Sequence, residues 1–237
     1  MQIAINHLTR MTEGHVCVAG VDLETGRHVR PVLTWGHLTP AVLARHQGPF
    51  DIGHVVELGG PVPWPKRPHV EDHLFDPSTT VLLERMDAEA FWALLVRTGK
   101  ARLSDIFGRD LRHAKDSPAC CVDLGKGIAS LGCLVPRRKP RLACQRHGQK
   151  TSLRMEIDDG QVTAWAPVTD LRLYQDDHVT PDLEAVERIR RRLAAPGAVI
   201  LSVGLTREFA SPHEPRGVHW LQVNNVHLES EPARPLG

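Results

Sequence analysis

The segment from residue 68 to residue 73 holds the side chains best suited to acid–base or metal chemistry. His69, Glu71, Asp72 and His73 could act as proton donors, proton acceptors or metal ligands. The preceding Pro68 favours a loop, and the spacing does not place two ligands one helical turn apart. We therefore treat these four residues as weak candidates for catalytic groups. We expect no metal site and no cofactor, because no set of three converging ligands is evident in the sequence.

A basic stretch between residues 137 and 154 is the clearest local signal for a bound polyanion. Its seven cations have no acidic residue among them and could neutralise the phosphates of a nucleic acid. They are Arg137, Arg138, Lys139, Arg141, Arg146, Lys150 and Arg154. A second group of arginines falls within residues 188–192. The alternative is a solvated charged face, since the net charge of the whole chain is only +1.

Two predicted strands far apart in the chain both end in Leu-Thr-Arg, at residues 8–10 and 205–207. Each is followed by a returning strand. Arginine, asparagine and aromatic side chains near such strand ends can stack on bases and hydrogen-bond to them. The candidates for this face are Arg10, Arg30, Arg207, Trp220 and Asn224. The alternative places Trp220 in the core and Asn224 in a turn.

Composition limits the class of protein. With 29 basic and 28 acidic residues, the chain has no global field that would attract nucleic acid or membrane. No apolar run approaches the ~20 residues needed to span a bilayer, and the N-terminus lacks a signal-peptide pattern. Five cysteines at irregular spacing fit reduced thiols better than a disulfide framework. We therefore expect a cytoplasmic protein that does not use a membrane as a partner.

The elements that position these residues are mainly short strands. Strands are predicted over residues 2–10, 15–21, 27–32, 51–58, 199–205 and 218–228, and an Asp-Asp-Gly turn predicts a hairpin over residues 152–166. One helix is predicted over residues 87–98, with Asp87 as its N-cap. A second is predicted over residues 180–194, with Thr180 as its N-cap and Pro181 in the first helical position.

A meander of strands, a helix and further strands occurs twice along the chain. This order predicts a mainly β protein with a few helices, built as two small β-barrels in tandem. The oligonucleotide-binding (OB) fold is the commonest barrel of this plan. We predict one OB-like module with a Pro-rich insertion over residues 1–114, a second over residues 115–228, and a loose tail over residues 229–237.

Several segments also resemble a known family. LTRM at residues 8–11, VCVAGVD at 16–22 and VRP at 29–31 resemble the opening of the bacterial dual OB-containing domain family, and LSVGLTR at 201–207 and WLQVNNVH at 220–227 resemble its closing segment. PHVED at residues 68–72 and VTDLR at 168–172 are similar to further parts of it. The resemblance spans nearly the whole chain. It implies two OB folds and recognition of nucleic acid or nucleotides, with an implied place in prokaryotic defence systems, and it supplies no catalytic residue.

Three functions remain as hypotheses. The first is a module that binds nucleic acid, favouring single strands or modified ends, or binds a nucleotide; the strand-end face would hold the bases and the basic stretch the phosphates. The second is an enzyme that processes a nucleotide or nucleic acid through the segment from His69 to His73. The third is a protein-interaction adaptor, with partner proteins of a defence system.

Overall fold

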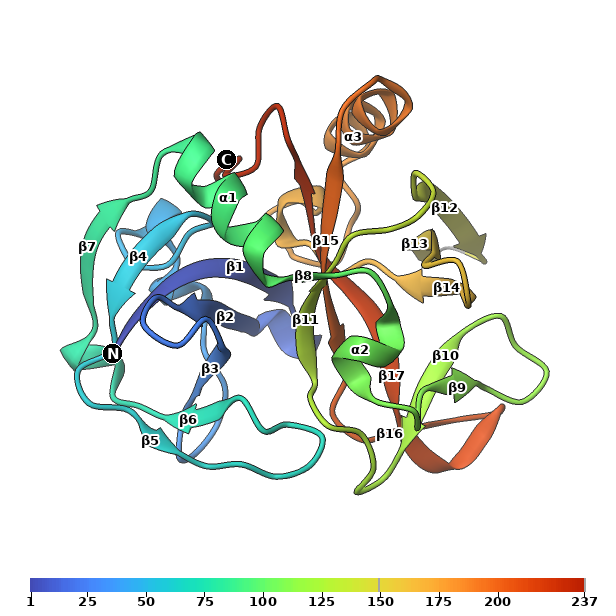
Figure 1. Ribbon diagram of the computed structural model, residues 1–237, viewed down its shortest axis with the longest axis horizontal. Helices are drawn as coiled ribbons and strands as arrows, with labels where there is room; N and C mark the ends of the chain where they lie inside the picture. Colours follow the sequence, from blue (N-terminus) through green and yellow to red (C-terminus); the bar gives the residue numbers. More distant parts are fainter. Residues whose placement is uncertain (149, 237) are drawn as a thin grey trace.

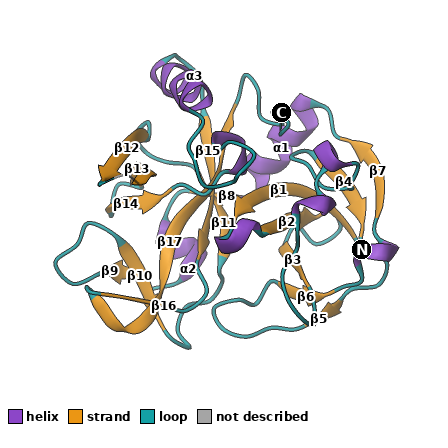
Figure 2. Ribbon diagram, turned by 180° about the vertical axis from the view of Figure 1, so that it is seen from behind, coloured by secondary structure: helices purple, strands orange, loops and turns teal. Residues whose placement is uncertain are grey.

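The computed structural model describes residues 1–148 and 150–236, without the side chains of His147 and Lys150. Two large β-sheets lie side by side, with a smaller three-stranded sheet beyond the second (Figure 1). Three α-helices cover parts of these sheets (Figure 2). The prediction of a mainly β protein with a few helices is confirmed.

The first sheet has the strand order β5-β6-β3-β2-β1-β4-β7. Its strands are β1 (Gln2–Arg10), β2 (Val16–Asp22), β3 (His28–Val32), β4 (His54–Glu57), β5 (Val62–Pro63), β6 (Asp72–Leu74) and β7 (Val81–Arg85). Only β3 and β6 pair in parallel. The four strands predicted before residue 58 are all present, whereas β6 falls in a polar segment whose sequence predicts no element.

The second sheet has the order β8-β11-β15-β17-β10-β9, with β16 also paired to β17. Its strands are β8 (Gly99–Lys100), β9 (Arg112–His113), β10 (Cys120–Asp123), β11 (Leu131–Leu134), β15 (Val199–Leu205), β16 (Phe209–Ser211) and β17 (Glu214–Leu228). The third sheet contains β12 (Arg141–His147), β13 (Lys150–Asp158) and β14 (Thr163–Pro167). The hairpin predicted at the Asp-Asp-Gly turn joins β13 to β14, and Gly160 has the positive φ of 88° that this turn requires.

Helix α1 (Ala88–Thr98) begins where predicted, because the Asp87 carboxylate accepts a hydrogen bond from the Ala90 amide at 2.8 Å. Helix α2 (Leu103–Phe107) is short. Helix α3 (Leu183–Ala194) is capped by Asp182, so the prediction of Thr180 as its cap is wrong. The Asp182 carboxylate, two residues after Thr180, accepts hydrogen bonds from the Glu184 and Ala185 amides at the start of the helix. No helix in the described residues is long and apolar enough to cross a membrane.

Each large sheet packs on its own hydrophobic core. The first core is built mainly by residues 3–95, with Phe91 and Leu95 of α1, and it also takes in Ile200 of β15. The second core is built by residues 103–228. The segment after residue 228 differs from the expected loose tail, because Ala233 and Leu236 are buried in the first core. The division at residues 114 and 115 stays a prediction.

Candidate functional site

A groove of about 960 Å³ lies where the open face of the first sheet meets the second sheet. One row of side chains crosses its floor on four neighbouring strands, because the strand register pairs His7 with Ala19 and Arg30 with Asp72. Between β2 and β3 the register pairs Gly20 with Val29, and its continuation by one residue places Arg30 opposite Ala19. We call His7, Ala19, Arg30 and Asp72 the floor row. All four line the groove.

The two Leu-Thr-Arg strand ends meet at this groove. Arg10 ends β1, and Arg207 follows β15; both line the groove, together with the threonine that precedes each of them. The Arg10 guanidinium lies over the Tyr174 ring, 4.6 Å from its centroid, and donates a hydrogen bond to the carbonyl of His178. The Arg207 side chain is 49 % exposed. Arg10 is therefore held in place, while Arg207 is open to a ligand.

Asp72 joins two arginines across the groove. Its Oδ1 accepts a hydrogen bond from Arg30 Nε at 2.6 Å, and its Oδ2 lies 2.8 Å from Arg207 Nη1. Asp72 and Arg30 are buried. Since β6 supplies Asp72 and the end of β15 supplies Arg207, this bridge ties the first sheet to the second. One carboxylate shared by two guanidiniums leaves a net positive charge at this point.

Asn224 completes the floor from the second sheet. Its Nδ2 lies 2.9 Å from His7 Nδ1, and its Oδ1 lies 3.5 Å from the Thr169 hydroxyl. Space for this amide depends on Gly204, because a Cβ at that position would come within 2.6 Å of Asn224 Nδ2. Arg10, Arg30, Arg207 and Asn224, four of the five residues predicted to share a face, therefore line one groove.

Exposed aromatic side chains surround the groove. Trp64 and Phe209 line it and are 56 % and 63 % exposed. Trp35, at 87 % exposed, falls in sequence between Thr34 and Gly36, which line the groove. Trp220, the aromatic residue singled out from sequence, instead lies beneath this rim: its Nε1 donates to the Phe209 carbonyl at 3.0 Å, and it packs beside Cys121. In sequence, Trp64 stands out only as a tryptophan between prolines.

Three of the four weak catalytic candidates, Glu71, Asp72 and His73, have structural partners. Glu71 Oε1 accepts hydrogen bonds from the Ser130 and Leu131 amides at 2.8 and 3.0 Å, and Oε2 accepts from the Ser130 hydroxyl at 2.8 Å. His73 Nδ1 lies 2.9 Å from the Glu71 carbonyl. Glu71 thus holds its segment against β11, and Asp72 binds Arg30 and Arg207. In the described residues no group of three metal-ligating side chains converges.

His69 is the exception, because neither of its ring nitrogens has a hydrogen-bond partner although the side chain is buried. Its ring meets that of His219 edge-on, with centroids 5.0 Å apart. Burial lowers the pKa of His69 to about 2, and the nearby charges of Arg30 and Arg207 act in the same direction. An imidazole with this pKa stays neutral at physiological pH, so His69 is a poor general acid.

The basic stretch lies outside the groove: none of its described residues between 137 and 154 lines it. Several of its cations already have partners. Arg141 Nε lies 2.9 Å from Glu156 Oε2, Arg138 lies 3.6 Å from Asp158, and Lys139 donates to the carbonyl of Ala195. Of the remaining cations, Arg137 and Arg146 are exposed and Arg154 is half-buried, while the Lys150 side chain lies outside the described part of the structure.

Comparison with known families now identifies the fold. The model of the dual OB-containing domain family matches residues 1–226, almost the entire chain. The chain belongs to this family. The prediction of two OB-like barrels in tandem is confirmed by this match. No curated protein is significantly similar to the chain.

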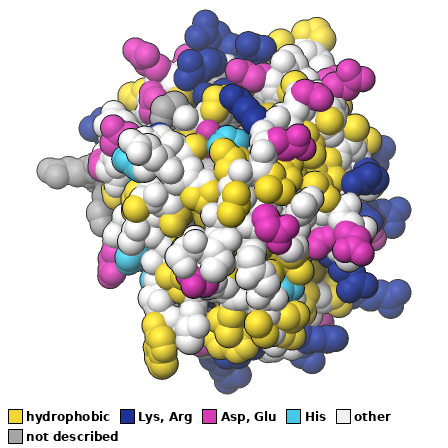
Figure 3. Space-filling model, turned by 90° about the vertical axis from the view of Figure 1, so that its left-hand side faces the viewer, with side chains coloured by type: hydrophobic (Ala, Val, Ile, Leu, Met, Phe, Trp, Pro, Cys, Tyr) yellow, Lys and Arg dark blue, Asp and Glu magenta, His cyan; other side chains and the backbone are white. Residues whose placement is uncertain are grey.

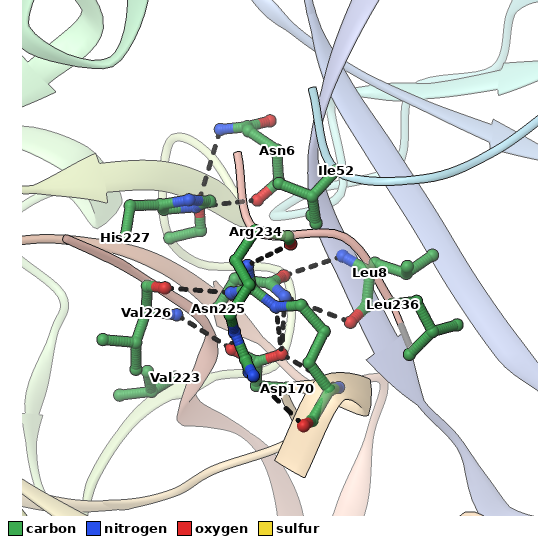
Figure 4. A network of polar contacts seen from close by, with 12 residues as sticks. Asn6, Leu8, Ile52, Asp170, Val223, Asn225, Val226, His227, Arg234 and Leu236 are labelled. Carbon is green, nitrogen blue, oxygen red and sulfur yellow. Dashed lines mark hydrogen bonds and ion pairs between the residues drawn. The ribbon is translucent and has the colours of Figure 1, made fainter. Parts of the chain in front are cut away.

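In this dual OB domain, two of the segments that carry the family resemblance form the junction between the barrels (Figure 4). Asp170 pairs with Arg172 at 2.7 Å, and both are buried. Asn225 Oδ1 accepts from the Leu8 amide of β1 at 2.7 Å, while its Nδ2 donates to Asp170 at 3.0 Å. The Asp170 carboxylate also accepts from the Val226 amide. These polar residues therefore fix β1 against β17 and so set the position of the groove walls.

Proposed function

We propose that the groove of this dual OB domain binds single-stranded nucleic acid. One observation carries the proposal: of the three aromatic side chains with large exposure in the described chain, Trp64 and Phe209 line this groove, and the third, Trp35, falls in sequence between two residues that line it. Exposed aromatic rings offer stacking surfaces to unpaired bases, worth about 1–3 kcal/mol per base. Such rings are costly to leave in water, so their gathering at one groove favours a ligand with flat faces.

The charge of the groove supports the same proposal. Four cations and two carboxylates line it, which leaves a net positive charge. The cations are Arg10, Arg30, Lys66 and Arg207, and the carboxylates are those of Asp72 and Glu208. Lys66 and Arg207 are exposed and Arg10 is partly exposed, so these cations could meet about three phosphates. For a single strand, three neutralised phosphates correspond to a salt-dependence slope of roughly −2 in a plot of log K against log salt.

The basic stretch is proposed as a second contact for longer strands. Arg137 and Arg138 are exposed, and the stretch adjoins α3, whose Arg190 Nε donates to the Leu142 carbonyl at 3.1 Å. A strand that leaves the groove and reaches this surface would release more counterions. We expect a 30-nucleotide strand to show a steeper salt slope than a 10-nucleotide strand. The Arg137→Ala/Arg138→Ala variant should remove that difference, whereas equal slopes in the wild type would rule out the second contact.

The test of the groove is fluorescence anisotropy with single-stranded DNA, single-stranded RNA and duplex at two salt concentrations. Trp64→Ala and Arg207→Ala should each weaken single-strand binding about five-fold or more. Leu183→Ala and Arg27→Ala are matched controls, because these residues are equally exposed but lie outside the groove. Equal loss in controls and groove variants, or no binding at low salt, would overturn the proposal.

A second candidate function, that of a protein-interaction adaptor, is supported by strand β7. This strand is a free edge of the first sheet, and its Val81, Leu82 and Leu83 are 54 %, 44 % and 46 % exposed. Figure 3 faces this side of the molecule and shows hydrophobic side chains at its surface. An exposed apolar edge can pair with a strand of another protein, here a proposed partner of a defence system. Leu82→Lys should abolish co-purification of that partner and leave nucleic-acid binding unchanged.

We place the protein in the cytoplasm as part of this proposal. The support is the odd number of cysteines at irregular spacing, which suits a reducing compartment. Fractionation of cells that produce a tagged chain would test it, and recovery in an oxidising compartment would contradict it.

A further inference from the structure

The floor of the groove contains two buried donors whose hydrogen-bonding capacity is not fully used. In the described chain, His7 Nε2 has no partner, and Arg30 Nη2 lies beside the Asp72 carboxylate without an aligned hydrogen bond. Buried polar atoms are nearly always satisfied, so two incompletely satisfied donors on residues that line one groove point to a ligand. A role for these donors in choosing among bases rests on the proposed binding of single-stranded nucleic acid.

The hydrogen bond to Asn224 fixes the proton of His7. The Asn224 amide nitrogen can only donate, so His7 Nδ1, 2.9 Å away, must accept. The Thr169 hydroxyl near Asn224 Oδ1 agrees with this orientation of the amide. Burial and the neighbouring charges lower the pKa of His7, which keeps the ring neutral. A neutral ring that accepts at Nδ1 carries its proton on Nε2, so the free group at the floor is an N–H donor.

Arg30 supplies the second donor. Its Nε hydrogen bonds to Asp72 Oδ1 at 2.6 Å, and Nη2 lies 2.6 Å from the same oxygen without directing a hydrogen at it. The guanidinium is therefore oriented by Asp72 while part of its donor capacity remains unused. A guanidinium donates only, whatever its ligand.

Ala19, which has the smallest side chain of the floor row, separates these donors. It lies between His7 and Arg30 in the floor row, so the two flanking strands are about 10 Å apart, twice the usual strand spacing. The rim above carries Trp64 and Phe209. A flat ring that stacks on the rim could turn one edge down over Ala19. The small side chain and the two donors thus define a pocket for the edge of a single base.

We propose that this pocket selects bases with a keto oxygen at position 4 of a pyrimidine or position 6 of a purine, namely thymine, uracil, guanine and hypoxanthine, over cytosine and adenine, which carry an amino group there. A keto oxygen would accept from the His7 and Arg30 donors. The amino group of cytosine or adenine would instead direct its own hydrogens at those donors. Leaving buried donors unpaired against a ligand donor is strongly disfavoured, as in other sites built to hydrogen-bond a particular group.

The experiment compares bases of similar size that carry either a keto oxygen or an amino group at this position. Anisotropy titrations would use 10-nucleotide strands of uracil against cytosine, and of hypoxanthine against adenine, each at one salt concentration. The wild-type protein should bind the keto member of each pair about five-fold more tightly or better, the scale of one base-specific contact. His7→Phe removes one donor and keeps a ring of similar size, and Ala19→Leu fills the pocket. In each variant, the keto and amino members of a pair should bind with similar affinity.

The outcomes separate base selection from the proposed function. Equal affinities within both pairs, with binding still dependent on Trp64, would overturn base selection and leave single-strand binding intact. That result is expected if the floor row binds a phosphate of the strand instead of a base. A keto preference that survives both variants would overturn the placement in this pocket. No binding of any strand would overturn both proposals. Thermal unfolding of the variants shows whether they fold, and the wild-type comparison tests base selection without them.

Discussion

Acidification provides a sharp test of the polar junction, because several histidines are buried there without charge. His227 is fully buried; its Nε2 lies 3.0 Å from the Ser202 hydroxyl, and its Nδ1 lies 3.0 Å from the Pro232 carbonyl. Burial, followed by the charge of Arg172, lowers the pKa of His227 from 6.5 to about 4. In the unfolded chain, this histidine therefore binds a proton as the pH falls below about 6.5, whereas in the folded chain it stays neutral until the pH approaches 4. Stability from this source is complete above pH 6.5 and is lost as the pH falls toward 4.

The size of the effect depends on the shift. At pH 5, a histidine with a folded pKa of about 4 and an unfolded pKa of 6.5 lowers the free energy of unfolding by about 2 kcal/mol. His69, with a folded pKa of about 2, lowers it by a similar amount over the same interval. The lowered pKa of His7 acts in the same direction. Together they remove about 4 kcal/mol or more, a large fraction of the 5–15 kcal/mol typical of a folded domain.

Urea unfolding at pH 7.5 and pH 5.0 measures this loss. His227→Gln should reduce the difference between the two pH values by about 2 kcal/mol, even though it destabilises the protein at pH 7.5. His213→Gln, at an exposed position, should leave the difference unchanged. A wild-type stability that changes by less than about 1 kcal/mol between the two pH values would refute the burial of neutral imidazoles at the junction.

Three further substitutions test how the groove is held. Glu71→Gln should cost about 1.5–3 kcal/mol in urea unfolding, because the two Glu71 carboxyl oxygens accept three hydrogen bonds there; an unchanged midpoint would contradict this role of Glu71. Asp170→Asn should cost about 3–5 kcal/mol by leaving Arg172 buried without its counter-charge, and a loss below 1 kcal/mol would show that the pair is dispensable. Gly204→Ala should cost about 1–3 kcal/mol and weaken oligonucleotide binding, since the new methyl group displaces the Asn224 side chain; unchanged binding would argue against that role.

The sequence predicted those helices and hairpins whose start or turn depends on residues close together in the chain. The start of α1 depends on one carboxylate three residues from the amide it caps, and the hairpin between β13 and β14 depends on one turn. Strands β1, β2, β3 and β15, which line the groove, were likewise recognisable from sequence, whereas β6 was not. The start of α3 was misplaced because Thr180 and Asp182 are both good caps, and only the folded chain shows that Asp182 meets the free amides.

Contacts between distant segments were not predictable in the same way. Asp72 reads as an acid in a polar loop, yet the parallel pairing of β3 with β6 delivers it to Arg30. Glu71 reads as a catalytic candidate, yet its oxygens are bound by amides almost 60 residues away. Trp64 reaches the groove because its amide donates to the Asp72 carbonyl, beside the short β5–β6 pair. Each depends on a tertiary pairing that leaves no periodic pattern in the sequence.

The repeated Leu-Thr-Arg was informative because each copy ends at a similar place in its own sheet. Arg10 and Arg207 are almost 200 residues apart, but both line the groove. A tripeptide alone could not have predicted that meeting. The shared context of strand, polar end and returning strand made the prediction of a common face possible.

The central claim is that aromatic and basic side chains of one groove bind single-stranded nucleic acid. The most direct measurement is the affinity of a 10-nucleotide single strand for the wild-type protein and for Trp64→Ala, across a series of salt concentrations. We predict wild-type binding with a slope of roughly −2 and a loss of about five-fold or more in the variant. Absence of wild-type binding at low salt, or equal affinity of the two proteins, would contradict the claim.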